Sequence, residues 1–312
     1  MSTDNNGGIK RPDGKVNAID TDYQIGQDNV ALKVGPFGLD IHNRVFAISG
    51  MAIVLFVVAT LTFRQQVEPF FAGLRAWLVS NLDWFFLASG NVFVIVCLVL
   101  IVTPLGRVRI GGTEATPDYS YAGWLAMLFA AGMGIGLMFW SVAEPVAYFT
   151  GWYETPLGVE ANSPEAARLA LGATMFHWGL HPWAIYGVVA LSLAFFTYNK
   201  GLPLSMRSIF YPLLGDRAWG WAGHIVDILA VLATLFGLAT SLGLGAQQAA
   251  SGIHHVFGVE PGLGLQIVVI TVVTLLAVVS VVRGIDGGVK VISNINMVVA
   301  FLLLILVGFI GW

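Results

Sequence analysis

The sequence predicts an all-α integral membrane protein with seven transmembrane helices. Hydrophobic residues make up 57% and charged residues 11% of the 312 residues, and the mean hydropathy is +0.79. A soluble domain carries about 25% charged residues, so a water-soluble fold of this composition would have too few charges to cover its surface. Seven separate segments are also apolar over the roughly 20 residues that a helix needs to cross a bilayer core of about 30 Å.

The seven apolar segments follow one another along most of the chain, at about 45–63, 84–105, 121–143, 169–197, 228–250, 261–282 and 291–312. Residues 1–43 are polar and rich in aspartate, which predicts a disordered tail. A secretory signal peptide would place an apolar stretch close to the start, whereas here the first one begins near Val45. We therefore expect two parts, a tail of residues 1–43 and a membrane domain of residues 44–312.

Lysine and arginine indicate the orientation of the segments, because cytoplasmic loops are enriched in both. With the tail inside, all 15 Lys and Arg residues except Arg64, Arg75 and Arg168 lie on the cytoplasmic side. The sequence thus predicts a multi-pass protein of the cell inner (plasma) membrane with a cytoplasmic amino terminus. The net charge of −3 gives no basic surface for nucleic acid, so the lipid bilayer is the expected partner and nucleic acid is not.

Three glycines, Gly132, Gly134 and Gly136, lie near the middle of the third segment in the run AAGMGIGLMFWSVAEP. One interpretation is helix packing, because Gly132 and Gly136 form a G-x-x-x-G pair that admits a close neighbour. The other is an unwound stretch, because three glycines in five residues weaken a helix by roughly 1 kcal/mol each. Unwound backbone inside a membrane survives where it lines a cavity, and its carbonyls can coordinate a cation.

Three aromatic residues of the fourth segment share one broad helix face in the run HWGLHPWAIY, namely Trp178, Trp183 and Tyr186. Aromatic rings attract a quaternary ammonium group by about 2 kcal/mol each when desolvated. This face is therefore a candidate for part of an ammonium cage. The competing interpretation is an interfacial aromatic belt, which suits Trp178 better than Trp183 or Tyr186, since those two lie nearer the centre of the span.

Two histidines of the same segment, His177 and His181, stand at i and i+4, a spacing that also suits a metal ion. No third ligand is evident nearby and the H-E-x-x-H pattern is absent, so the sequence predicts no metal site and no cofactor. A membrane enzyme or metal-binding sensor built on these histidines remains the alternative from another functional class. Glu144 and Asp227 are expected to be structural ion-pair or hydrogen-bond partners.

Hydroxyl groups mark one face of the fifth segment, where Thr234, Leu238 and Ser241 follow at i, i+4 and i+7. Two hydroxyl oxygens on one face suit a hard cation, which prefers oxygen ligands. The ordinary alternative is that each hydroxyl bonds to a carbonyl of its own helix. The helix alone does not decide between the two.

Together, the runs GMGIGLMFWSVAEP, HWGLHPWAIY, VLATLFGLATSLGLGA and RGIDGGVKVISNIN resemble the betaine/carnitine/choline transporter family. The resemblance covers about residues 45–312 and implies twelve helices of the LeuT-like transporter fold, in which two peripheral helices precede a pair of five-helix inverted repeats. Helices one and two here would be peripheral, and helices three to seven would form the first repeat. The resemblance further implies a homotrimer and, because the apolar residues run to Trp312 without a polar tail, a truncated sequence that lacks the second repeat.

The resemblance also implies roles for particular residues. The aromatic substrate box would receive Trp178, Trp183 and Tyr186 from the fourth helix. The other end of the substrate would touch the glycine stretch, including Gly132, Met133, Gly134 and Gly136. In sodium-coupled relatives one ion is held by carbonyls that match Ala130 and Met133, and another by a hydroxyl that matches Thr234. A second hydroxyl expected near position 238 is a leucine here, and Ser241 is the substitute available.

The coupling ion is predicted from Gly136. Proton-coupled choline transporters of the family carry an aspartate at this place, so the glycine favours sodium coupling and a zwitterionic substrate such as glycine betaine. The resulting prediction is a non-enzymatic, sodium-driven symporter for quaternary-ammonium or zwitterionic solutes. The alternative within the family is a proton-coupled or exchange-type transporter of choline or carnitine.

Overall fold

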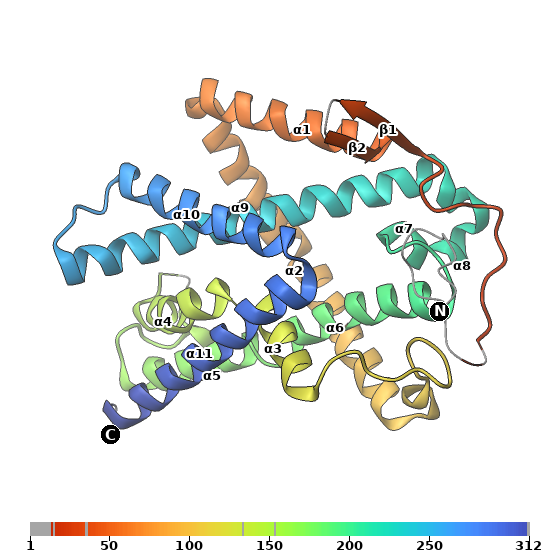
Figure 1. The fold of residues 1–312 in the computed structure, drawn as a ribbon. Helices are drawn as coiled ribbons and strands as arrows, with labels where there is room; N and C mark the ends of the chain where they lie inside the picture. The colour runs from red at the N-terminus through yellow and green to blue at the C-terminus, as the bar shows by residue number, and fades with distance from the viewer. Residues whose placement is uncertain (1–13, 15, 35–36, 133, 153, 311–312) are drawn as a thin grey trace. The chain divides into compact units, whose positions relative to one another are not determined.

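A computed structural model describes residues 14, 16–34, 37–132, 134–152 and 154–310. The chain divides into two compact units, one made of residues 1–116 and 180–236 and the other of residues 117–179 and 237–312. Figure 1 colours the elements in chain order. Each unit is described by itself.

Unit 1 is made of two segments of the chain, which contribute a pair of strands and both long and short helices. Its elements are β1 (Asn29–Val34), β2 (Phe37–His42), α1 (Asn43–Thr62), α2 (Arg64–Val102), η1 (Pro104–Arg107), α6 (Leu180–Ala194), η3 (Phe195–Asn199), α7 (Met206–Ile209), α8 (Tyr211–Leu214), η4 (Gly215–Trp219) and the first part of α9 (Trp221–Phe257). Within this unit α2 packs against α1 and α6.

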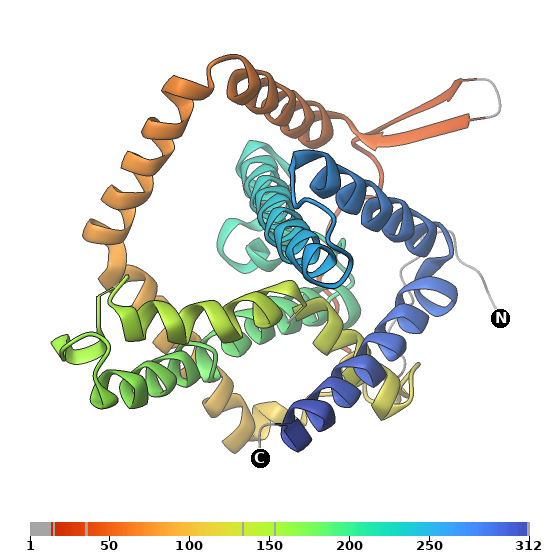
Figure 2. The same cartoon turned by 90° about the vertical axis from the view of Figure 1, so that its left-hand side faces the viewer.

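Unit 2 contains the remaining helices. Its elements are α3 (Tyr121–Gly132), α4 (Ile135–Thr150), η2 (Pro156–Gly158), α5 (Pro164–His177), the rest of α9, α10 (Leu263–Val282), η5 (Ile285–Val289) and α11 (Lys290–Ile310). Here α3 packs against α11, and α4 lies alongside α5 (Figures 1 and 2).

The predicted membrane helices are present. In the described part of the chain, six helices are long and apolar enough to cross a membrane if Pro164–Asn199, which holds α5, α6 and η3, counts as one of them, or seven if the bent pair α3 and α4 also counts as one span. Each of the seven predicted segments overlaps one of these spans, which confirms the all-α membrane class. The bounds differ most in α2, which begins at Arg64 rather than near residue 84, because its polar residues such as Asn81 and Asp83 continue the helix without being apolar enough for a span.

The structure differs from the predicted disordered tail in residues 29–34 and 37–42, which form two antiparallel strands with Leu32 opposite Leu39. Alternating apolar residues in the first strand, such as Val30 and Leu32, give it the period of two that suits a strand. The side chain of Asn29 donates a hydrogen bond to Asp40 across the pair at 2.8 Å. This small sheet is the exception to the otherwise helical fold of the described residues.

The tail is also held by a buried arginine. Arg207 is 3% exposed, and its Nε lies 3.1 Å from Oδ2 of Asp227. Its Nη2 donates to the hydroxyl of Tyr23 at 2.9 Å. The Tyr23 ring stacks on Trp219 with 4.3 Å between centroids, and the guanidinium lies over both rings. Tyr23, although it lies in the polar tail, is therefore docked onto the segment that precedes α9.

The same cluster sets the protonation of His42, which caps α1. Burial, followed by the positive charge of Arg207, lowers the pKa of His42 below its ordinary value of 6.5. Nε2 of His42 lies 3.2 Å from Nη2 of Arg207. A neutral imidazole at pH 7 follows, because a second positive charge beside the arginine is disfavoured.

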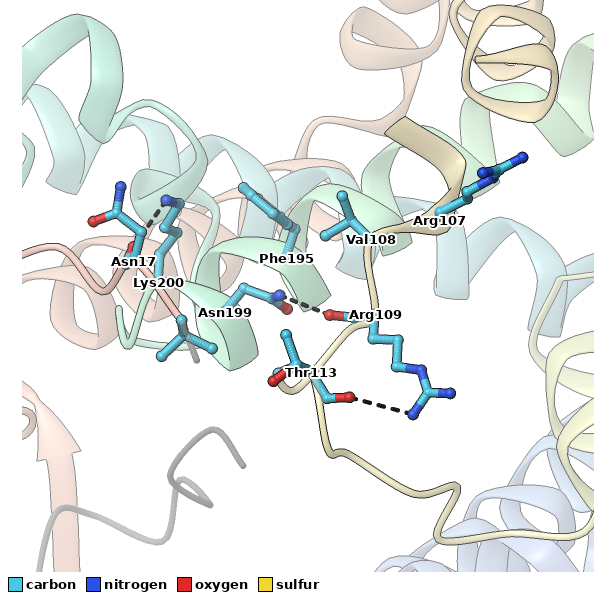
Figure 3. A pocket seen from close by; sticks show the side chains of 10 residues that line it. Asn17, Arg107, Val108, Arg109, Thr113, Phe195, Asn199 and Lys200 are labelled. Carbon is cyan, nitrogen blue, oxygen red and sulfur yellow. Dashed lines mark hydrogen bonds between the residues drawn. The ribbon is translucent and has the colours of Figure 1, made fainter. Parts of the chain in front are cut away.

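A second set of hydrogen bonds in unit 1 joins the tail, the end of η3 and the loop that follows η1 (Figure 3). Asn199 donates to the carbonyl of Arg109 at 2.8 Å and accepts from the backbone N–H of Gly111 at 2.9 Å. Lys200 donates to the carbonyl of Asn17 at 2.8 Å. Asn17, Arg109, Asn199 and Lys200 are among the residues that line a pocket of about 510 Å³. In Figure 3 the charged ends of Arg107, Arg109 and Lys200 point in different directions, so they do not converge on one anion.

Replacing the buried arginine tests this cluster. Arg207→Ala is expected to lower the free energy of unfolding by about 3–5 kcal/mol, because it leaves the Asp227 carboxylate buried without its cation. Unfolding of the purified protein by denaturant in detergent measures the change. Arg64→Ala is the matched control, because Arg64 pairs with Glu68 in the open, with 83% and 73% of the side chains exposed. The control should lose less than about 1 kcal/mol, and equal losses would contradict the role of Arg207.

Candidate functional site

The candidate site begins at a break in the third predicted span. Helices α3 and α4 meet at an angle of 57°. Gly134, the N-cap of α4, has φ −85° and ψ −109°, which is not helical. The structure therefore has the interruption that the unwound interpretation of the glycines predicts.

The two helix ends at this break carry backbone groups that no turn of helix satisfies. The first N–H groups of α4 and the last carbonyls of α3 have no partner inside their own helices. Ala130 is in the last turn of α3, and its carbonyl oxygen lies 3.9 Å from the place that a Cβ on Gly134 would occupy. Met133, predicted to bind both substrate and sodium, lies outside the described residues. Gly132 closes α3 directly before it.

Trp178 ends α5 and contacts the start of α4. It is the C-cap of α5, with φ −93° and ψ 6°. Its ring atom Cη2 lies 3.4 Å from the place that a Cβ on Gly136 would occupy. The indole therefore lies next to Gly136, at a distance where a Cβ would make ordinary van der Waals contact with the ring. Two predicted site residues, 42 positions apart in the sequence, are thus brought together.

A buried carboxylate holds the other edge of the same indole. Glu144 on α4 is 3% exposed. Its Oε2 accepts a hydrogen bond from Nε1 of Trp178 at 2.6 Å, and its Oε1 lies 2.6 Å from Nδ1 of His177. Both carboxylate oxygens are used, in short bonds of the charge-assisted kind. The expected role of Glu144 as a hydrogen-bond partner is confirmed. The sequence analysis, however, did not connect Glu144 with Trp178.

The second part of α9 touches the first turn of α4 at two places. A Cβ on Gly245 would lie 3.2 Å from Cγ1 of Ile135, the first residue of α4. The side chain of Gln248 donates to the carbonyl of Met138 at 3.4 Å. Contacts from α9 and from Trp178 thus fix the beginning of α4 within unit 2.

Trp183 and Tyr186 form the other aromatic pair. Both are on α6, and their rings meet edge to face with 6.3 Å between centroids and 65° between planes, within the range of favourable aromatic pairs. Trp183 is 38% exposed. This pair belongs to unit 1 and Trp178 to unit 2. The cage made of all three residues therefore stays a prediction.

The Thr234 hydroxyl on α9 is bonded within its own helix. The Thr234 hydroxyl donates to the carbonyl of Ala230 at 2.8 Å, as the ordinary interpretation expects. Its oxygen retains lone pairs that a cation can use. Ser241 is exposed on the same helix, seven residues on. A sodium site shared by these residues remains a prediction.

The two histidines once considered as metal ligands have separate partners. His177 bonds to Glu144, whereas Nε2 of His181 lies 3.0 Å from Oδ1 of Asn91 on α2. Among the described residues there is no cluster of three or more His, Cys, Asp or Glu side chains that would hold a metal ion. The arrangement gives no support to the metal-binding alternative.

The sequence matches known transporters over most of its length. Residues 44–312 match the model of the betaine/carnitine/choline family transporters. The chain is 80% identical over 293 residues to glycine betaine transporter 1 of Vibrio parahaemolyticus, covering 94% of this chain and 55% of that protein. It is 72% identical to a glycine betaine/proline/choline transporter of the same organism, covering all of this chain and 59% of that protein.

A more distant relative supports the same assignment. The chain is 39% identical over 267 residues to the glycine betaine transporter OpuD of Bacillus subtilis, covering 86% of this chain and 51% of that protein. The chain thus spans about half the length of the curated relatives it matches. The family match over residues 44–312, together with the helical membrane fold, shows that this chain belongs to the betaine/carnitine/choline transporter family.

Proposed function

We propose that the protein is an ion-coupled symporter that imports quaternary-ammonium solutes such as glycine betaine. The observation that carries the proposal is the Trp178 indole lying against Gly136 at the break between α3 and α4. The names of the relatives, which include glycine betaine, proline and choline transporters, support the same substrate class. Transport by alternating access involves no covalent chemistry.

Glycine betaine has two charged ends, and the two kinds of surface near the break suit one each. Its trimethylammonium group offers no N–H, so it is recognised by aromatic faces rather than by hydrogen bonds. Its carboxylate suits the N-terminus of α4, where free N–H groups and the helix dipole favour a negative charge. In this proposal the aromatic box of Trp178, Trp183 and Tyr186 binds the ammonium group, and the stretch from Gly132 to Gly136 binds the carboxylate.

Sodium is the proposed coupling ion. The carbonyl of Ala130, in the last turn of α3, would hold one ion together with that of Met133, since a helix C-terminus carries partial negative charge. Thr234, with Ser241 as a second hydroxyl, would hold another. Each sodium ion that enters down 100 mV contributes about 2.3 kcal/mol, and each tenfold inward gradient about 1.4 kcal/mol more. One or two ions are therefore enough to concentrate the solute substantially.

The architecture and location in this proposal follow the family resemblance. The two peripheral helices and the first five-helix repeat of a LeuT-like fold would occupy residues 44–312. The working protein would be a homotrimer in the inner (plasma) membrane, with its amino terminus in the cytoplasm. The excess of lysine and arginine on one side of the spans supports this orientation.

The aromatic box is tested by replacing Trp183 in the intact protein. Trp183→Leu is expected to weaken glycine betaine binding by about thirtyfold, because it removes a cation–π contact of about 2 kcal/mol and keeps the site apolar. Trp183→Phe should be milder. Equilibrium binding to purified protein measures both. Trp84→Leu on α2, where the Trp84 side chain is 64% exposed, is the control and should bind normally. Normal binding by Trp183→Leu as well would return Trp183 to the aromatic-belt interpretation.

The coupling ion is tested through Gly136. Wild-type uptake into vesicles is expected to stop when potassium replaces sodium. Gly136→Asp should lose part of its sodium dependence and gain pH dependence, because a carboxyl group buried there has a raised pKa and can carry a proton. Uptake with each cation at two pH values is the measurement. Wild-type uptake that ignores sodium and follows the proton gradient would instead support the proton-coupled alternative.

A further inference from the structure

The Trp178 indole has a neighbour on α4 beside each of its two rings. Nε1 of the five-membered ring donates to Glu144, and Cη2 of the six-membered ring lies near Gly136. Trp178 is a C-cap residue, and the next residue, Gly179, begins the connection to α6. The helix therefore constrains the backbone of Trp178 only on one side, and side-chain contacts, among which the bond to Glu144 is the hydrogen bond, orient the ring.

Glu144 is placed to orient the ring rather than to bind a ligand. Its side chain is 4% exposed, and both of its oxygens are already in short contacts, with His177 and Trp178. Gly136 and Glu144 lie eight residues apart on α4, about 12 Å along the helix axis. The indole bridges these two points, so it lies along α4 and extends to the glycine break.

A buried carboxylate is costly unless it is fully hydrogen-bonded. An apolar side chain at position 144 would pack beside α5 without that cost. An apolar residue, however, could not accept the indole N–H, and the ring would lose its fixed edge. A negative acceptor also polarises the N–H bond and increases the electron density of the ring, which strengthens its attraction for a cation.

We propose that Glu144 is a positioning residue that sets the affinity for the quaternary ammonium group by holding the Trp178 ring against Gly136. This inference rests on the proposed function, because it takes Trp178 as a wall of the ammonium site. Glu144 itself does not touch the solute. Its effect on binding must therefore pass through the indole N–H of Trp178.

A double-mutant cycle in the intact protein tests this path, with the dissociation constant for glycine betaine as the readout. Glu144→Ala is expected to weaken binding about tenfold, and Glu144→Gln about threefold, because the amide oxygen of glutamine still accepts the indole N–H but lacks the charge. In a Trp178→Phe background, Glu144→Ala should change binding by less than about twofold, because phenylalanine has no N–H to hold. Glu68→Ala, which removes an exposed carboxylate of α2, is the control and should bind as wild type.

The outcomes separate the positioning role from the proposed function. Equal losses from Glu144→Ala in both backgrounds would show a general structural role and overturn the inference, as would no loss in either. Trp178→Leu tests the site itself. Weak binding by Trp178→Leu with normal binding by Glu144→Ala overturns only the positioning role, whereas normal binding by Trp178→Leu overturns both. If Glu144→Ala does not accumulate in the membrane, the same cycle is made with Glu144→Gln. The positioning role then requires that Glu144→Gln weakens glycine betaine binding about threefold in the wild-type background and leaves it unchanged in the Trp178→Phe background.

Discussion

Backbone groups that lose their helical partners inside an apolar segment must be satisfied by something else, and this constraint underlies the candidate site. The bend of 57° between α3 and α4 leaves the carbonyls of one helix end and the N–H groups of the other near the same place. In the proposed function, the carboxylate of the solute and a sodium ion would supply these two kinds of partner.

The hydrogen bonds of Glu144 connect this break to the end of α5. Bonds to a charged acceptor contribute about 1.5–3 kcal/mol each, while desolvation of a buried carboxylate costs several kcal/mol. The net gain in stability is small, so the value of Glu144 lies in where it holds the Trp178 ring. The buried pair of Arg207 and Asp227 in unit 1 follows the same logic, because it docks Tyr23 of the tail at a defined place.

Much of the fold could be predicted because it depends on local composition. The apolar segments identify the spans, whereas Gly132, Gly134 and Gly136 are compatible with either close helix packing or a break, and the structure has the break. The docking of Tyr23 could not be predicted, because Arg207 lies 184 residues away and only the fold brings the two together. The same holds for Glu144, which is 34 residues from Trp178. The sequence analysis places the start of this span too late, because the first part of α2 is helical without being apolar throughout.

The central claim is that the site recognises the positive charge of a quaternary ammonium group through aromatic rings. The most direct measurement compares binding of glycine betaine with binding of its tert-butyl analogue, in which carbon replaces the charged nitrogen and the shape is kept. The account predicts that the intact protein prefers glycine betaine by at least about thirtyfold, the equivalent of one desolvated cation–π contact, and that Trp178→Leu reduces this preference. Equal affinity of the wild-type protein for the two compounds would contradict the account.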